Sequence, residues 1–340
     1  MVNTRRGDAS AATIHHFYRE YHGHTVDHLN TVIESVPSGR GKIFLVGDST
    51  LDNKYWLNSQ RDACNGYERV LAPPRSVPDV CFWMNRECEQ RQLPFCCINC
   101  AIEESTLGLR QSGSMLPQDA VVQQHIRDGD ILVVSCGGND IALRPTAMTV
   151  VSMLTLLLSP RWAIEWGIAP GLSHFVRLFR DSTRRYVETL IGERAPLCVV
   201  VCMLYYLDEA PGGSWADAVL QKLGYDRDPG KLQLVMRKIY ELGTQQVALA
   251  HHPTVEVVPV PLYEALDGRD SSDYVQRVEP SAQGGQKMAA LIHDRIARVI
   301  AAGIEGKGGS QASAHDASVG TAAINSDVIE MPSAVHNRRR

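Results

Sequence analysis

Short runs of apolar and β-branched residues recur along the chain, at positions 42–46, 95–99, 131–135, 197–203 and 255–260. Each run is almost continuously apolar rather than alternating, which is typical of strands buried on both faces of a parallel sheet. Segments with helical spacing of apolar positions separate or follow these runs, at 78–92, 118–127, 175–192, 231–250 and 281–301. This alternation predicts a three-layer α/β/α sandwich with a five-stranded parallel sheet. Ligands of such folds bind at the carboxyl ends of the strands.

The two ends of the chain differ in pattern from this central part. Apolar residues at steps of three and four predict an N-terminal helix over residues 12–36, weakened near Gly23 and followed by a linker, so that residues 1–40 precede the main domain. That domain covers residues 41–303, because Ala302 and Gly303 close the last helical pattern. Residues 304–340 are rich in Gly, Ser and Ala, a composition that predicts a disordered tail.

Composition and charge exclude several classes of protein. The 340 residues are 44% hydrophobic and 21% charged, as in an ordinary globular protein, and the net charge of −4 gives no basic field for nucleic acid. The most apolar stretch, at 147–158, is shorter than the ~20 residues of a membrane span. The first residues lack the apolar core of a signal peptide, so we expect no transmembrane segment and a cytoplasmic location.

The histidines and cysteines give no sign of a metal site. The nine cysteines are an odd number and several lie in apolar runs, so we expect buried free thiols, despite the Cys-x-x-Cys spacing of Cys97 and Cys100. Histidines gather near the N-terminus, with His24 and His28 one helical turn apart. No framework of carboxylates or cysteines accompanies them, so we interpret them as a solvated helix face and predict no metal.

Candidate chemistry follows two of the apolar runs. Gly47-Asp48-Ser49 comes after the first run, and Gly137-Gly138-Asn139-Asp140 comes after the third. A serine at a tight turn is well placed as a nucleophile, and an asparagine amide on a neighbouring strand can point at a developing oxyanion. At two strand ends of one sheet, the pair predicts an acyl-transfer site built on Ser49 and Asn139.

Both motifs resemble the conserved blocks of the SGNH, or GDSL, hydrolases. Pro280-Ser281 with Gly284 is similar to the end of the last block, and the resemblance covers roughly residues 41–300. It implies a flavodoxin-like fold, no cofactor, and hydrolysis of a small-molecule or lipid-like ester or thioester. Ser49 would be the nucleophile, and its N–H and the Asn139 amide would form the oxyanion hole, with Asp48 and Gly138 beside them.

The sequence departs from this family pattern in two places. Glu104 stands where the second block has a glycine, and the Asp and His of the last block become Gln276 and Glu279. The string around Glu279, together with Asp52-Asn53 in the first block, is similar to a divergent SGNH branch that carries Glu-Pro-Ser. Glu279 would then be the base or an orienting group. Its pKa would have to rise, through burial or through a like charge on Glu104 or Asp273.

Two hypotheses of different class follow. The first is an esterase that uses Ser49 as the nucleophile and a base other than histidine. The alternative is an inactive binding protein of the same fold, in which Ser49, Asn139 and Glu279 hydrogen-bond a polar ligand. A histidine base from the pair His251-His252 is a third reading, although this pair precedes the last strand, at the opposite edge of the sheet.

Substrate contacts are assigned from position along the chain. Asp52 and Asn53 follow the nucleophile turn, and Tyr206 follows the fourth strand, so we expect all three near the crevice; core packing is the other reading for Tyr206. The insertion at 141–178 is rich in Leu, Val, Met and Trp. Its place after the oxyanion turn suggests a hydrophobic lid or acyl pocket, and the equal alternative is a helix packed on the core.

Overall fold

The computed structural model describes residues 12–110 and 115–315. A parallel five-stranded sheet forms its centre, with the strand order β6-β2-β7-β8-β9. The strands are β2 (Gly41–Gly47), β6 (Phe95–Asn99), β7 (Ile131–Ser135), β8 (Cys198–Met203) and β9 (Glu256–Pro261). The predicted α/β fold and its five parallel strands are therefore confirmed.

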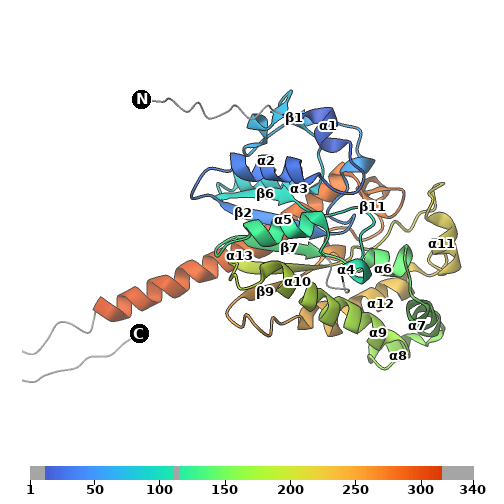
Figure 1. The fold of residues 1–340 in the computed structure, drawn as a ribbon. Helices are drawn as coiled ribbons and strands as arrows, with labels where there is room; N and C mark the ends of the chain where they lie inside the picture. The colour runs from blue at the N-terminus through green and yellow to red at the C-terminus, as the bar shows by residue number, and fades with distance from the viewer. Residues whose placement is uncertain (1–11, 111–114, 316–340) are drawn as a thin grey trace, which may run out of the picture. The chain divides into compact units, whose positions relative to one another are not determined.

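Helices cover both faces of this sheet (Figure 1). The main ones are α3 (Val80–Gln90), α5 (Pro117–His125), α10 (Thr183–Ile191) and α12 (Pro229–Leu242). The connection β2–α3–β6 moves along the sheet in the opposite direction to β6–α5–β7 and β7–α10–β8. Because parallel crossovers are right-handed, α3 lies on the opposite face from α5 and α10. Three layers result.

The N-terminal region forms two helices, α1 (Ile14–Tyr18) and α2 (Val26–Ser35), so the single helix expected over 12–36 is wrong. The break contains Gly23 with φ +78°, where a Cβ would lie 3.0 Å from the Ala101 carbonyl oxygen. Close packing against the loop after β6 therefore requires the break. The histidine prediction also needs correction, because His24 and His28 are buried beside the Phe17 ring rather than solvated.

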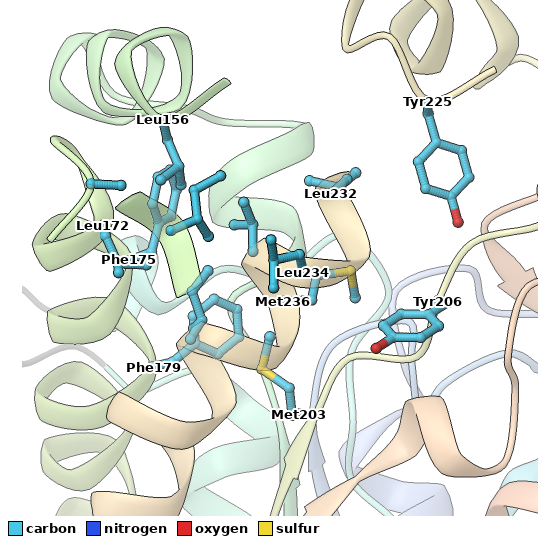
Figure 2. Packing of buried hydrophobic residues seen from close by; sticks show 14 of the residues in the cluster. Leu156, Leu172, Phe175, Phe179, Met203, Tyr206, Tyr225, Leu232, Leu234 and Met236 are labelled. Atoms are coloured by element: carbon cyan, nitrogen blue, oxygen red, sulfur yellow. The ribbon is translucent and has the colours of Figure 1, made fainter. Parts of the chain in front are cut away.

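The insertion after β7 builds α7 (Ala147–Leu158), α8 (Arg161–Glu165) and α9 (Leu172–Arg177). A hydrophobic cluster joins these helices to α12, and Figure 2 shows Leu156, Phe175 and Phe179 within it. Tyr206 belongs to the same cluster. The inner side of the insertion is therefore a core layer, as one of the two sequence readings expected.

Smaller elements complete the chain. Two-stranded sheets pair β1 (Ala12–Thr13) with β4 (Leu71–Ala72), β3 (Arg61–Asp62) with β5 (Arg75–Ser76), and β10 (Tyr274–Val275) with β11 (Glu279–Pro280). Short helices are α4 (Leu107–Arg110), α6 (Gly138–Ala142) and α11 (Asp217–Lys222). Leu178–Ser182 is a π-helical turn, and 3₁₀ turns lie at Lys54–Trp56, Tyr67–Arg69, Thr244–Gln246, Leu262–Glu264 and Ser271–Asp273.

The chain divides into two compact units, Met1–Val299 and Ile300–Arg340. Helix α13 runs from Ala282 to His315, past the end expected at Ala302-Gly303. A single glycine costs a helix about 1 kcal/mol, which weakens the helix without having to end it. Residues 316–340 of the expected tail lie outside the described residues. No helix in the described part of the chain is long and apolar enough to cross a bilayer.

Candidate active site

The turn that carries Ser49 lies very close to the end of the neighbouring strand β7. Strand β2 ends at Gly47 with φ +120°, where a Cβ would lie 1.6 Å from the Ser135 carbonyl oxygen at the end of β7. The Asp48 N–H donates to that same carbonyl at 3.0 Å. Only glycine allows this approach, and it leaves Ser49 half-buried at the carboxyl edge of the sheet.

Hydrogen bonds tie the loops after β2, β6 and β7 together. The Gly47 carbonyl oxygen accepts from the Ile102 N–H at 3.0 Å and from the Ser105 hydroxyl at 2.8 Å. The Asp140 carboxylate accepts from the N–H groups of Leu107 and Gly108, at 2.8 Å each. The positions of the predicted nucleophile and oxyanion turns are thus fixed relative to each other through the loop after β6.

Asn139 lies on the first turn of α6 and is buried. Its Nδ2 donates to the Ser105 carbonyl oxygen at 3.1 Å. A side-chain amide has two N–H donors, so one remains for a substrate oxygen. Gly138, just before it, lies against the nucleophile turn, since a Cβ there would be 3.6 Å from Asp48 Oδ2.

Glu279 lies in β11 and is only 5% exposed. The Ser49 side chain lies near enough to this carboxyl group to lower its pKa, and Oε2 of Glu279 has no partner among the described residues. Arg277, two positions earlier, pairs instead with Asp217 at 2.8 Å and with Asp226 at 3.0 Å. No ion pair with Arg277 therefore neutralises Glu279, and Ser49 is the polar side chain that lowers its pKa.

Several negative charges surround Glu279. Burial is the largest cause that raises its pKa well above the ordinary value, followed by the charges of Glu103, Asp48 and Asp52, while the Ser49 side chain lowers it. Burial and the Asp52 charge raise the pKa of Glu103 to about 8. Burial also raises the pKa of Asp48 to about 6. The site therefore holds protons at pH values where ordinary carboxyl groups have lost them.

The like charge expected from Glu104 or Asp273 comes instead from Glu103. Asp273 is bonded to Lys287 Nζ at 2.7 Å and to Gln283 Nε2 at 2.9 Å, and neither it nor Glu104 is a main cause of the Glu279 shift. Glu103 is 3% exposed, and its Oε2 has no partner among the described residues. The Glu-Glu pair after a buried strand was the available sequence signal, but burial of the first glutamate depends on tertiary packing.

Glu104 adopts the backbone conformation of a glycine. Its φ is +59°, in the left-handed region, at the position where the resemblance to SGNH hydrolases expects that residue. The carboxylate accepts a hydrogen bond from the Tyr21 hydroxyl at 3.1 Å. Within the described residues, neither its N–H nor that of Ser49 has an acceptor. These two N–H groups are the candidate backbone donors for an oxyanion.

Asp52 and Asn53 lie behind Ser49, fully buried. Asp52 Oδ1 pairs with Lys54 Nζ at 2.6 Å, and its Oδ2 accepts from the Glu103 N–H at 3.0 Å. The Asn53 amide donates to the Pro280 carbonyl oxygen at 2.9 Å and accepts from the Val80 N–H at 3.0 Å. Because every one of these contacts is internal, both side chains position the loops. The substrate contact that the sequence suggested for them is therefore replaced by a structural role.

Tyr206 also points away from the predicted crevice. Its ring stacks on Tyr263 at 4.8 Å within the cluster of Figure 2, and its hydroxyl accepts from Arg237 at 3.0 Å. The core reading of this residue is therefore the right one. The preceding Tyr205 is closer to the site: its hydroxyl donates to the Val278 carbonyl oxygen at 2.6 Å, and the Glu279 charge contributes to its raised pKa.

A pocket of about 330 Å³ is lined in part by the loop after β6, and Ser49, Asn139 and Glu279 are not among its lining residues. Glu103, Glu104 and Ser105 form one wall, and Leu109, Leu116 and Arg144 contribute to the others. His22 from the N-terminal region completes part of its rim. No group of three or more His, Cys, Asp or Glu side chains in the described residues could hold a metal ion.

Comparisons with known proteins give similarity only at the level of solved structures. No protein-family description matches the chain, and no curated protein matches it. Among the structures, a lipase/acylhydrolase from Enterococcus faecalis is 16% identical over 74% of this chain and 93% of its own, with a TM-score of 0.39.

Two further structures are similar to the same extent. An extracellular lipase from Streptomyces rimosus is 14% identical, covers 75% of this chain and 99% of its own, and has a TM-score of 0.41. An acetyl xylan esterase from Geobacillus stearothermophilus is 12% identical over 77% and 96% of the two chains, with a TM-score of 0.44.

Proposed function

We propose that the protein is a hydrolase that cleaves a carboxylic ester or thioester, with Ser49 as the nucleophile and Glu279 as the base. The observation that carries this proposal is the position of the Ser49 side chain beside a buried glutamate that has no pairing cation, near enough to lower the pKa of that glutamate. A raised pKa makes an ionised glutamate a stronger base than an ordinary one, which suits it to accept a serine proton.

The proposed reaction has two halves. Ser49 Oγ attacks the acyl carbon while its proton passes to Glu279, and the free N–H of Asn139 stabilises the oxyanion together with the N–H groups of Ser49 and Glu104. The leaving alcohol or thiol takes the proton from Glu279, and the acyl group remains on Ser49. Water then gives a proton to Glu279 as it attacks the acyl-enzyme, and Glu279 returns that proton to Ser49 Oγ as the acid leaves, which restores both groups.

Hydrolysis of p-nitrophenyl acetate and butyrate by purified variants tests this proposal. We expect Ser49→Ala and Glu279→Gln to lower kcat/KM by about 1,000-fold or more, and Asn139→Ala by about 100-fold. Ser173→Ala, at an exposed serine of α9, is the matched control. Wild-type activity rises with pH, because Glu279 must lose its proton and its pKa is raised. Equal rates for wild type and Ser49→Ala would refute the proposal.

A binding protein without turnover is the second candidate function, and the same raised pKa of Glu279 favours it. A protonated glutamate donates a hydrogen bond, so Ser49, Asn139 and Glu279 would form a neutral polar site for a ligand. A fluorophosphonate probe distinguishes the two functions. Labelling of Ser49 supports the hydrolase, whereas an unlabelled, inactive protein supports the binding protein. A cytoplasmic location stays a prediction, which localisation of a tagged full-length chain would test.

A further inference from the structure

Helix α7 places its apolar side chains outward. Its buried residues are Thr149, Ser152 and Leu156, two of them polar. The opposite face carries Met148, Val151, Leu154 and Leu158, which are 60%, 56%, 56% and 84% exposed. These four follow steps of three and four residues and so share one side of the helix. A surface helix ordinarily has the reverse arrangement, because apolar surface is stabilised by burial.

The inner face of α7 is accounted for by its contacts with α9. A Cβ on Gly171 would lie 2.2 Å from the Ser152 carbonyl oxygen, so the two segments approach too closely for large side chains. Thr149 Oγ1 is hydrogen-bonded to His174 Nε2 at 3.0 Å. The outer face has no such cover within the described residues, so packing inside the chain does not explain its composition.

Helix α8 extends this exposed apolar surface. Trp162 and Trp166 are 55% and 76% exposed, one helical turn apart, with ring centroids 6.0 Å from each other. We name the set Met148, Val151, Leu154, Leu158, Trp162 and Trp166 the α7–α8 face. Tryptophan is the side chain enriched at the boundary between lipid and water, because its ring is apolar and its N–H is polar.

The charged residues around the α7–α8 face indicate which kind of surface it would contact. Residues 145–160 contain no charged side chain, and Arg144 and Arg161 flank them. Across 141–178 the basic residues are Arg144, Arg161 and Arg177, against the single acid Glu165. Arg161 is paired with Asp228 from outside this segment, whereas Arg144 and Arg177 are exposed and have no ion pair among the described residues. Apolar side chains bordered by arginines complement a surface whose phosphate groups lie above acyl chains. Arg144 also lines the pocket beside Glu103 and Glu104.

We propose that the α7–α8 face docks on a phospholipid surface, from which the ester substrate reaches the pocket. This inference rests on the proposed function for the fate of the substrate, whereas the docking itself needs no turnover. The apolar residues would enter the acyl region, and Arg144 and Arg177 would meet phosphate groups. Arg144 lies in the link between α6 and α7 and lines the pocket, so the pocket lies near the first turn of α7.

Vesicle co-sedimentation of the full chain carrying Ser49→Ala tests the docking apart from catalysis. The probes are vesicles of phosphatidylcholine alone and of phosphatidylcholine with 30% phosphatidylglycerol (about one anionic lipid in three, enough for a surface potential). We expect binding that is stronger on the anionic vesicles and at least about tenfold weaker when Leu154→Gln and Leu158→Gln are added. Leu197→Gln, at an exposed leucine just before β8, is the matched control and should not change binding.

Each outcome decides the proposal. Absence of binding by the Ser49→Ala chain, or equal binding by the Leu154/Leu158 variant, overturns it, and so does a wild-type dimer that this variant dissociates. Circular dichroism and thermal melting confirm that the variants remain folded. With Ser49 intact, the Leu154/Leu158 variant should keep its rate on soluble p-nitrophenyl acetate and lose rate on an ester held in vesicles. Binding without any Ser49-dependent hydrolysis refutes the proposed function and leaves the docking intact.

Discussion

At the scale of single residues, the site places the buried cation Lys54 among several buried acids. Lys54 is 2% exposed, and its ammonium group pairs with Asp52, which also accepts from the Glu103 N–H. Burial and the Asp52 charge raise the pKa of nearby Asp79 to about 7. Lys54 is therefore one of the positive charges that make this concentration of carboxyl groups behind Ser49 tolerable, and its charge lowers the pKa values of Asp79 and Glu103.

Removal of this cation should destabilise the protein strongly. Lys54→Met leaves Asp52 buried and unpaired, which is expected to lower the free energy of unfolding by about 3–5 kcal/mol. The matched control is Arg86→Met, because Arg86 and Glu89 form an ion pair with both side chains about half exposed. That change should cost less than about 1 kcal/mol. Urea denaturation measures both values, and equal losses would contradict the role assigned to Lys54.

At the scale of elements, the end of strand β2 is the position that tolerates least change. Gly47 combines a left-handed φ with an approach to Ser135 that excludes any side chain. The turn that presents Ser49 and the pairing of β2 with β7 depend on the same atom positions. The active-site turn is thus part of the central sheet rather than a loop added to it.

Gly47→Ala should therefore prevent native folding or lower the melting temperature by more than 10 °C, since ~1 kcal/mol corresponds to a few degrees for a chain of this size. Gly66→Ala is the control, because Gly66 has φ +109° but no heavy atom within 4 Å of an added Cβ. It should cost only backbone strain, on the order of 1–2 kcal/mol. Thermal melting followed by circular dichroism compares the two, and similar losses would mean that the contact with Ser135 is unimportant.

The elements also show what the sequence could and could not predict. The strands were predictable because continuous apolar runs leave few other structures, and the motifs of Ser49 and Asn139, which each follow such a run, were then expected at strand ends of one sheet. The break at Gly23 was not, because it depends on contact with the Ala101 carbonyl, which lies in a distant loop. Glu103 was missed for the same reason. Its neighbour Glu104 occupies the motif position, whereas the packing of the loop after β6 buries Glu103, whose charge raises the pKa of Glu279.

At the scale of the whole molecule, buried carboxyl groups should control stability at neutral pH. The pKa values of Asp79 and Glu103 are raised to about 7 and about 8, and that of Glu279 is also raised. Such groups keep their protons in the folded state over a range where the unfolded chain has released them. Their contribution to stability is complete below the unfolded pKa and is lost as the pH rises through the folded pKa.

The free energy of unfolding should therefore fall between about pH 6.5 and about pH 8. Buried histidines such as His293, whose pKa is lowered to about 4, oppose the trend only below pH 6.5, because above it they are neutral in both states. Glu103 alone contributes up to about 2 kcal/mol across this window. Urea denaturation at several pH values measures the slope. Glu103→Gln should flatten it, and Glu193→Gln, at an exposed glutamate, should not. A stability that rises with pH would contradict the prediction.

The burial of all nine cysteines, which the sequence predicted, has a consequence for how the molecule ages. Burial raises the pKa of thiols such as Cys64 and Cys198 to about 12, so the folded chain presents almost no thiolate to an oxidant. Unfolding exposes all nine thiols at once, and an odd number of cysteines cannot all form disulfide bonds within one chain. Under air, transient opening therefore ends in covalent cross-links between chains, and shelf life follows the opening rate rather than the equilibrium free energy.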